Sequence, residues 1–406
     1  MKHPLLLIIS IFQVFTLGLY YYGPIKYGWG DMSPSVAVYV IVYLAMLNLG
    51  YFLAKRYYFK GISGPSNHIF FVKFSASVTL LLFPFALLGK VGDLSSTASL
   101  GDLYGMSGAR KAEGESWFDY IRIFLGYFLF GLFPVLIWYR KSLPKHLFVL
   151  GCAAVVSNLI ITILTGVNKV LFDYIIIAVC LILYKSKASD LFSRRGVIAA
   201  IFTGCCVVAA AAFFVEGQIT RYGSSAISGE NPRIGAYSEY SIEDGKLKVL
   251  YSSLTGYLSQ GYRAFDLALD KQFEFTWGVG HSTFLTRQVD RLLGTNIADN
   301  AYPAKIEEDG WDRYINWSTF YVWWASDLSF YGVAFLMLML GMLFRCVENT
   351  LSVQGDLSAM ILYSYILILL FYLSANNQVF QSGEMAIGFL SLLIPFLVKR
   401  KLIRRG

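Results

Sequence analysis

The chain has 406 residues, of which 56% are hydrophobic and only 15% are charged. Soluble domains carry about a quarter charged residues, so this composition excludes an ordinary soluble globular protein. The net charge of +8 arises mostly from basic loops between apolar segments and does not indicate nucleic-acid binding.

Apolar runs of about 18 residues recur along the chain, which is the length needed to cross a hydrocarbon core of ~30 Å. We expect the first run to be a retained helix rather than a signal peptide, because it ends in the interfacial aromatic residues Tyr20, Tyr21 and Tyr22 and lacks an A-x-A-like cleavage site. The predicted fold is an all-α polytopic membrane protein with ten spans, at about 4–22, 34–54, 69–89, 118–138, 147–166, 169–185, 197–215, 319–344, 357–375 and 385–398.

The orientation follows from the basic residues in the short loops. With ten spans, these residues fall on the same side as both termini, and the positive-inside rule makes that side cytoplasmic. The residues are Lys55, Arg56, Lys60, Arg140, Lys141, Lys145, Lys185, Lys187, Arg194, Arg195, Arg345, Lys399, Arg400, Lys401, Arg404 and Arg405. None of the five cysteines falls in an outside loop, so the sequence offers no disulfide framework there.

Ionisable residues in the spans gather at the outer ends of their helices under this topology, and such residues usually mark a site or a pathway. Asp119 and Arg122, or Lys169 and Asp173, are spaced to pair on one helix face. Asp327 has no partner in its own helix, which favours a functional role or a buried pair. A transporter needs polar groups at the midplane as well, so the one-sided arrangement favours a site at the outer leaflet.

A polar insert at 216–318 separates the first seven spans (1–215) from the last three and the basic tail (319–406). The topology places it outside, in the periplasm of a bacterium. Apolar residues at helical spacing predict amphipathic helices over 246–272 and 282–293, joined by a glycine turn at 278–280.

The most distinctive local patterns lie in this insert and at its edges. In this order and topology, over about 160–345, they resemble the O-antigen polymerase (Wzy) family of bacterial envelope enzymes. The patterns are Thr165-Gly166-Val167-Asn168-Lys169, Tyr257-Leu258-Ser259-Gln260-Gly261-Tyr262, Gly278-Val279-Gly280-His281-Ser282, Tyr302-Pro303, Trp311-Asp312, Trp317-Ser318-Thr319-Phe320-Tyr321, Ala325-Ser326-Asp327 and Gly332.

The resemblance implies a GT-C-like membrane glycosyltransferase that takes part in lipopolysaccharide or similar polysaccharide biosynthesis. Such an enzyme transfers a glycan chain from undecaprenyl diphosphate onto another lipid-linked repeat unit, at the periplasmic face of the inner membrane. The family also implies a chain-length co-polymerase as a partner. The position of Arg263, after Gln260-Gly261-Tyr262, is less often basic in the family.

An enzyme of this kind needs cations to hold the departing diphosphate, and arginine can bond two phosphate oxygens at once. The candidates on the outer side are Arg110, Arg122, Lys169, Arg221, Arg263, Arg287 and Arg313, with Arg221, Arg287, Arg110 and Lys169 ranked highest. The acceptor hydroxyl needs a general base. His281 is the only histidine outside the cytoplasmic side, and Asp312 and Asp327 are the alternatives.

No His/Asp cluster has metal-ligand spacing on the outer side, and we predict neither a metal nor another cofactor. Two other functions stay open. A flippase or exporter of lipid-linked sugars predicts midplane charges and two related halves, which the sequence lacks. An O-antigen ligase-like transferase shares the donor and the chemistry, and the sequence separates it poorly from a polymerase.

Overall fold

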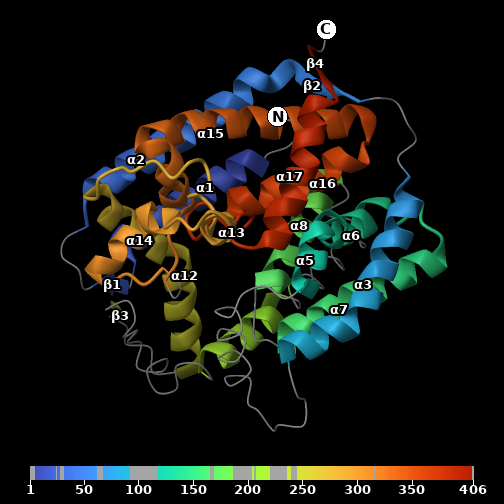
Figure 1. Cartoon of the computed structure of the whole chain (residues 1–406), viewed down its shortest axis with the longest axis horizontal. Helices are drawn as coiled ribbons and strands as arrows, with labels where there is room; N and C mark the ends of the chain where they lie inside the picture. Colours follow the sequence, from blue (N-terminus) through green and yellow to red (C-terminus); the bar gives the residue numbers. More distant parts are fainter. Residues whose placement is uncertain are drawn as a thin grey trace.

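The computed structural model describes residues 5–23, 25–27, 32–61, 67–91, 117–164, 169–185, 204, 207–219, 236–238, 245–313 and 316–404. Helices dominate these ranges (Figure 1). Arg110 and Arg221, two of the predicted phosphate contacts, lie outside the described residues, as does most of the motif before Lys169.

Within the described ranges, five helices are long and apolar enough to cross a membrane. They are α1 (Leu5–Tyr22), α2 (Pro34–Leu53), α3 (His68–Val91), α7 (Lys145–Leu164) and α15 (Phe320–Gln354). A sixth candidate is the pair α5 (Trp117–Phe124) and α6 (Gly126–Tyr139), bent by 55° between them. These helices agree with the predicted class of α-helical membrane protein.

The remaining predicted spans fall on shorter helices, so the count of ten stays a prediction. These helices are α8 (Lys169–Lys185), a helix at 207–219, α16 (Leu357–Phe371) and α17 (Gly383–Val398). Each of these helices has fewer than 18 residues, the length that the candidate membrane spans reach. At 1.5 Å per residue, a 15-residue helix such as α16 extends over only ~22 Å.

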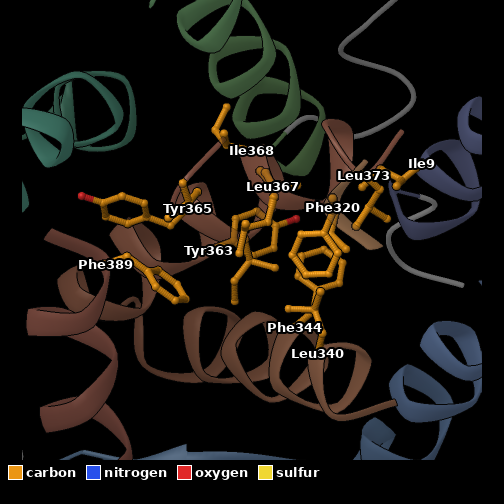
Figure 2. Packing of buried hydrophobic residues seen from close by; sticks show 14 of the residues in the cluster. Ile9, Phe320, Leu340, Phe344, Tyr363, Tyr365, Leu367, Ile368, Leu373 and Phe389 are labelled. Carbon is orange, nitrogen blue, oxygen red and sulfur yellow. The ribbon is translucent and has the colours of Figure 1, made fainter. Parts of the chain in front are cut away.

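The helix α16 forms the centre of the core. All of its residues from Ala359 to Leu370 are buried, as expected for a helix that is apolar on every side. Phe344 of α15 stacks on Tyr363 of α16 with ring centroids 5.4 Å apart, and Figure 2 shows this contact beside Phe320 and Leu340. The N-terminal end of α15, where Asp327 lies, is held by a different contact: the Phe320 N–H donates to the carbonyl of Leu373, just after α16, at 3.0 Å.

Glycines allow α2 and α15 to lie in close contact along their lengths (Figure 1). A Cβ atom on Gly50 would overlap the backbone carbonyl of Leu338, and one on Gly341 would overlap that of Leu47. Small residues at such reciprocal positions let two helix backbones approach closely, which is a common device in membrane helix packing.

The helix α15 is broken near its start. Ser329 has φ 58° and ψ 168°, so the segment Phe320–Leu328 and the longer segment after it have different axes. That backbone region is essentially restricted to glycine, and a serine there is strained. Asp327 therefore lies two residues before a strained break, on the short N-terminal segment.

The insert is helical where its spacing predicts helices. The helices α12 (Gly245–Leu269) and α13 (Thr283–Leu293) fall on the two predicted stretches. The second half of α12 is buried, and Tyr262 contacts Thr16 of α1, with their hydroxyls 3.1 Å apart. Shorter helices follow: η2 (Ile297–Asn300), α14 (Tyr302–Lys305) and η3 (Ile306–Asp309).

Two small antiparallel sheets, which the predicted all-α fold did not include, join distant parts of the chain. In one, β1 (Ile25–Tyr27) pairs with β3 (Ala236–Ser238) of the insert. In the other, β2 (Tyr57–Lys60) pairs with β4 (Lys401–Arg404) in the basic tail, and η1 (Ala54–Arg56) leads into it from α2. The second sheet brings two predicted cytoplasmic segments together.

Candidate active site

The site is built around the buried carboxylate of Asp327, which is 4% exposed. Its Oδ1 accepts hydrogen bonds from the Gly280 N–H at 3.0 Å and from the Thr276 hydroxyl at 2.5 Å. Its Oδ2 accepts a hydrogen bond from the His281 N–H at 2.9 Å. These donors orient the carboxylate, which compensates for the cost of burying a charge.

The imidazole ring of His281 completes this arrangement. Its Nδ1 lies 2.8 Å from Asp327 Oδ2, so Nδ1–H donates to the carboxylate and Nε2 becomes the acceptor nitrogen of the neutral ring. Trp324 stacks on the ring at 3.9 Å, and Phe380 meets it edge-on at 4.7 Å. No hydrogen bond to Nε2 is formed by any other residue in the described part of the chain. The pair therefore fixes the orientation of the imidazole and leaves Nε2 as the ring nitrogen that does not bond to Asp327.

The turn before α13 has a backbone suited to this role. Trp277 and Gly278 both have positive φ, at 57° and 76°, which tightens the turn. A side chain on Gly280 would collide with Thr276, so only glycine lets this N–H reach Asp327. Ser282 then caps α13 by accepting a hydrogen bond from the Leu285 N–H at 3.2 Å.

The connection between α16 and α17, residues 372–382, holds this turn in place; we name it the α16–α17 segment. The Asn377 side-chain amide donates to the His281 carbonyl at 2.7 Å. The Phe380 carbonyl accepts a hydrogen bond from the Ser282 hydroxyl, and Gln381 Oε1 accepts one from the Thr283 hydroxyl at 2.8 Å. The segment thus fixes the start of α13 and, through it, His281.

Two of the predicted cations contact the same segment or its continuation into α17. Lys169 Nζ donates to the Gln378 carbonyl at 3.2 Å and lies 3.4 Å from the Met385 sulfur. Arg122 forms an ion pair with Glu384, with both Nε and Nη2 3.0 Å from Glu384 Oε2. The partner of Arg122 is thus a carboxylate of α17 rather than Asp119.

The second pair that the sequence left open, Lys169 with Asp173, is an interaction at longer range. Asp173 is buried at 4% exposure, and no ion pair joins its carboxylate to the Lys169 amine in the described structure. The Lys169 amine itself bonds only to a carbonyl and a thioether in the described structure. Within the described residues, no carboxylate therefore contacts the Lys169 amine directly.

Arg263 belongs to a different cluster. It forms a buried ion pair with Asp266 one turn further along α12, at 2.7 Å. The Tyr20 hydroxyl and the Ser33 N–H also donate to Asp266, at 3.2 and 3.3 Å. Burial raises the pKa of Asp266, while these contacts and the Arg263 charge oppose that shift. Arg263 thus has a carboxylate partner that ties α12 to α1 and α2.

The other predicted residues of the insert also lie apart from the Asp327 contacts. Arg313 pairs with Glu307 at 3.2 Å and with Asp299 at 3.4 Å, which orders the loop between α13 and α15. Arg287 is exposed on α13, and Asp312 is half-buried in the loop after η3. Of the three predicted bases, His281 and Asp327 form one unit and Asp312 is not part of it.

Sequence reasoning assigned no role in the site to several of the residues that make it up. They are Thr276, Trp324, Asn377, Gln378, Gln381 and Glu384. Three signals were present in the sequence: residues 376–384 form the loop between the ninth and tenth predicted spans, Glu384 is an ionisable residue at the outer end of the tenth span, and Trp324 lies in an aromatic-dense stretch that leads into the eighth span. The density of amides in Asn376-Asn377-Gln378 and Gln381 could have marked this loop for attention, because amides both donate and accept hydrogen bonds.

Among the residues that the structure describes, no group of three or more histidine, cysteine or acidic side chains is placed to hold a metal ion. Comparisons of the chain with protein families, with curated proteins and with solved structures found no match.

Proposed function

We propose that this protein is a membrane glycosyltransferase that polymerises O-antigen or a similar surface polysaccharide. It would transfer a glycan chain from undecaprenyl diphosphate onto the sugar of a second lipid-linked repeat unit. The observation that carries the proposal is the buried His281–Asp327 pair, in which an oriented histidine presents Nε2 as a base. The ordered motifs that resemble the O-antigen polymerase family support the assignment of the substrate class.

In the proposed reaction, a hydroxyl of the acceptor sugar gives its proton to His281 Nε2 as its oxygen attacks the anomeric carbon of the donor. The bond from that carbon to the diphosphate oxygen breaks, and undecaprenyl diphosphate leaves with the bonding electron pair. Asp327 accepts the Nδ1–H hydrogen bond and stabilises the imidazolium that forms. General-base catalysis of this kind contributes roughly 10²–10⁴-fold to a rate.

Lys169 is the described cation best suited to the leaving diphosphate. Its amine now bonds to a carbonyl oxygen and a sulfur, and a diphosphate oxygen would be a stronger partner than either. Arg122 is already neutralised by Glu384, so its proposed role is to position the start of α17. Arg287, Arg110 and Arg221 remain proposed diphosphate ligands on the basis of the sequence.

The proposed location is the bacterial inner membrane, with both termini in the cytoplasm and the site facing the periplasm. The basic loops carry this part of the proposal, because they cluster on one side when ten spans are counted. A chain-length co-polymerase is the proposed protein partner, on the family resemblance alone.

The function is tested by deleting the gene in a host that bears O-antigen or capsule. We expect the surface glycan to be capped with a single repeat unit, and a plasmid copy of the gene to restore the ladder of longer chains. A plasmid copy with His281→Ala should be expressed but should leave single units. An unchanged ladder of glycan chain lengths after deletion would contradict the proposal.

The same deletion separates the two alternatives. Loss of a flippase leaves the lipid-linked unit in the cytoplasmic leaflet, so the surface carries no repeat unit at all. Loss of a ligase-like transferase leaves polymer attached to undecaprenyl diphosphate and none attached to the lipid A core. Glycan gels combined with analysis of the lipid-linked pool distinguish the three patterns.

A further inference from the structure

The side chain of Asn377 is bonded at one end only. It is fully buried, and its Nδ2 donates to the His281 carbonyl at 2.7 Å. Its Oδ1 is also buried and has no hydrogen-bond partner within the described structure. The Asn377 amide nitrogen thus holds the backbone of His281 in place, while the amide oxygen is an acceptor without a partner in the described structure.

Gln381, four residues further along the α16–α17 segment, has the complementary arrangement. Its Oε1 accepts a hydrogen bond from the Thr283 hydroxyl at 2.8 Å, which fixes the direction of the amide. Its Nε2 is buried and has no partner among the described residues. Gln381 therefore offers an unused donor, where Asn377 offers an unused acceptor.

Trp324 supplies a second unused donor. Its indole ring stacks on the imidazole of His281 at 3.9 Å with an angle of 7° between the planes. Its Nε1–H is buried and has no partner in the described part of the chain. Each of these three residues contacts His281 directly or contacts the helix that begins beside it.

Three residues that contact His281 or the start of α13 thus each have one buried polar atom without a partner in the described structure, whereas almost all buried polar groups in proteins are hydrogen-bonded to protein or to ordered water. The diphosphate of a lipid-linked sugar is esterified at both ends and carries no P–OH group at neutral pH, so it only accepts hydrogen bonds and cannot satisfy Asn377 Oδ1. A lipid chain can satisfy none of the three. Sugar hydroxyls both donate and accept, and they match one acceptor and two donors that carry no net charge.

We infer that Asn377, Gln381 and Trp324 form the binding subsite for the acceptor sugar, a neutral saccharide whose hydroxyls bond to these three side chains. The inference rests on the proposed function, and it assigns the acceptor to the side of His281 that faces the α16–α17 segment. Lys169 bonds to the carbonyl of Gln378, the residue after Asn377, so the diphosphate contact lies next to this subsite in the chain.

Two substitutions remove the unused donors, and the negative charge that the first of them adds is matched by the control below. Gln381→Glu keeps the oxygen that bonds to Thr283 but loses the Nε2 donor. Trp324→Phe keeps an aromatic ring against His281 but loses Nε1–H. In a reconstituted polymerisation assay, we expect each to raise KM for the acceptor about three- to tenfold, which corresponds to one hydrogen bond, with KM for the lipid-diphosphate donor unchanged.

Gln288→Glu is the matched control, because Gln288 lies on α13 and its Oε1 likewise accepts a hydrogen bond, from Tyr120 at 3.1 Å. It should leave KM for the acceptor unchanged. If wild type polymerises and both test variants keep the wild-type KM for the acceptor, the inference is wrong while the proposed function stands.

If the wild-type protein does not polymerise at all, the proposed function is wrong. A binding measurement then tests the sugar subsite by itself. Calorimetric titration of the purified full-length protein would use a neutral repeat-unit oligosaccharide without lipid or phosphate. Binding that Gln381→Glu and Trp324→Phe weaken, but Gln288→Glu does not, supports the subsite independently of catalysis. Absence of binding, or binding equal in all four proteins, overturns it.

Discussion

Asp327 accepts hydrogen bonds from the Gly280 and His281 N–H groups, from the Thr276 hydroxyl and from the His281 ring. So many donors to one buried carboxylate give it two functions, since it fixes the turn before α13 and orients the histidine ring. A surface aspartate does neither. The most informative single substitution therefore keeps the size of the Asp327 side chain and removes its negative charge.

Asp327→Asn keeps the size of the side chain but replaces one carboxylate oxygen with an amide nitrogen. We expect the polymerisation rate to fall about 10²-fold or more, because the imidazolium formed in the reaction loses its counter-charge. Single-turnover rates with purified protein measure this. Asp312→Asn, on the half-buried aspartate that the sequence offered as an alternative base, should retain the wild-type rate. Equal losses in the two variants would contradict the assignment.

Ser329 is strained in the helix break beside the site, with φ 58° and ψ 168°. Because glycine adopts this conformation freely, Ser329→Gly should stabilise the protein by about 1 kcal/mol. Thermal unfolding in detergent would show a higher Tm, with Asp327 still in place and polymerisation retained. A lower Tm would mean that the Ser329 side chain stabilises the folded protein by more free energy than its strained backbone costs.

At the scale of helices, much could be predicted from the sequence. The apolar runs predicted α1, α2, α3 and α7, and helical spacing predicted α12 and α13, because both signals depend on local composition. The pairing of His281 with Asp327 could not be predicted, since 46 residues separate the two. Each residue was a candidate on its own, but only the packing of α15 against α16 and the α16–α17 segment brings them together.

The contact between α2 and α15 is the element-level feature with the sharpest test. A methyl group on Gly341 would overlap the backbone of α2, so Gly341→Ala should cost about 1–3 kcal/mol, the usual cost of overpacking. Gly18→Ala in α1 is the control, because a Cβ there meets no atom within 4 Å. It should be neutral or stabilising, since alanine favours a helix by about 1 kcal/mol over glycine. Equal effects on Tm would contradict the close packing.

Over the whole molecule, the described structure confirms a helical membrane protein with five or six candidate spans, and the sequence predicts ten. The difference arises because composition defines apolar runs, whereas α16 and α17 are short helices whose crossing depends on how they are packed. The number of crossings decides which side of the membrane the insert faces, and with it the side on which His281 acts.

Sidedness can be measured with a cysteine introduced at Glu308, whose side chain is 83% exposed in the insert. We expect a membrane-impermeant thiol reagent to label it in intact spheroplasts, because the proposed topology places the insert outside. A cysteine at exposed Lys401 in the basic tail should react only after the membrane is opened. The reverse pattern would place the insert in the cytosol and would contradict a periplasmic site.

The most direct measurement is polymerisation by the purified protein in proteoliposomes that contain only an undecaprenyl-diphosphate-linked repeat unit. Wild type should convert this single substrate into a ladder of longer lipid-linked glycans without added nucleotide, whereas His281→Ala should leave it as single units. A wild-type protein that yields no ladder, or a His281→Ala protein that yields the same ladder at the same rate, would contradict the account.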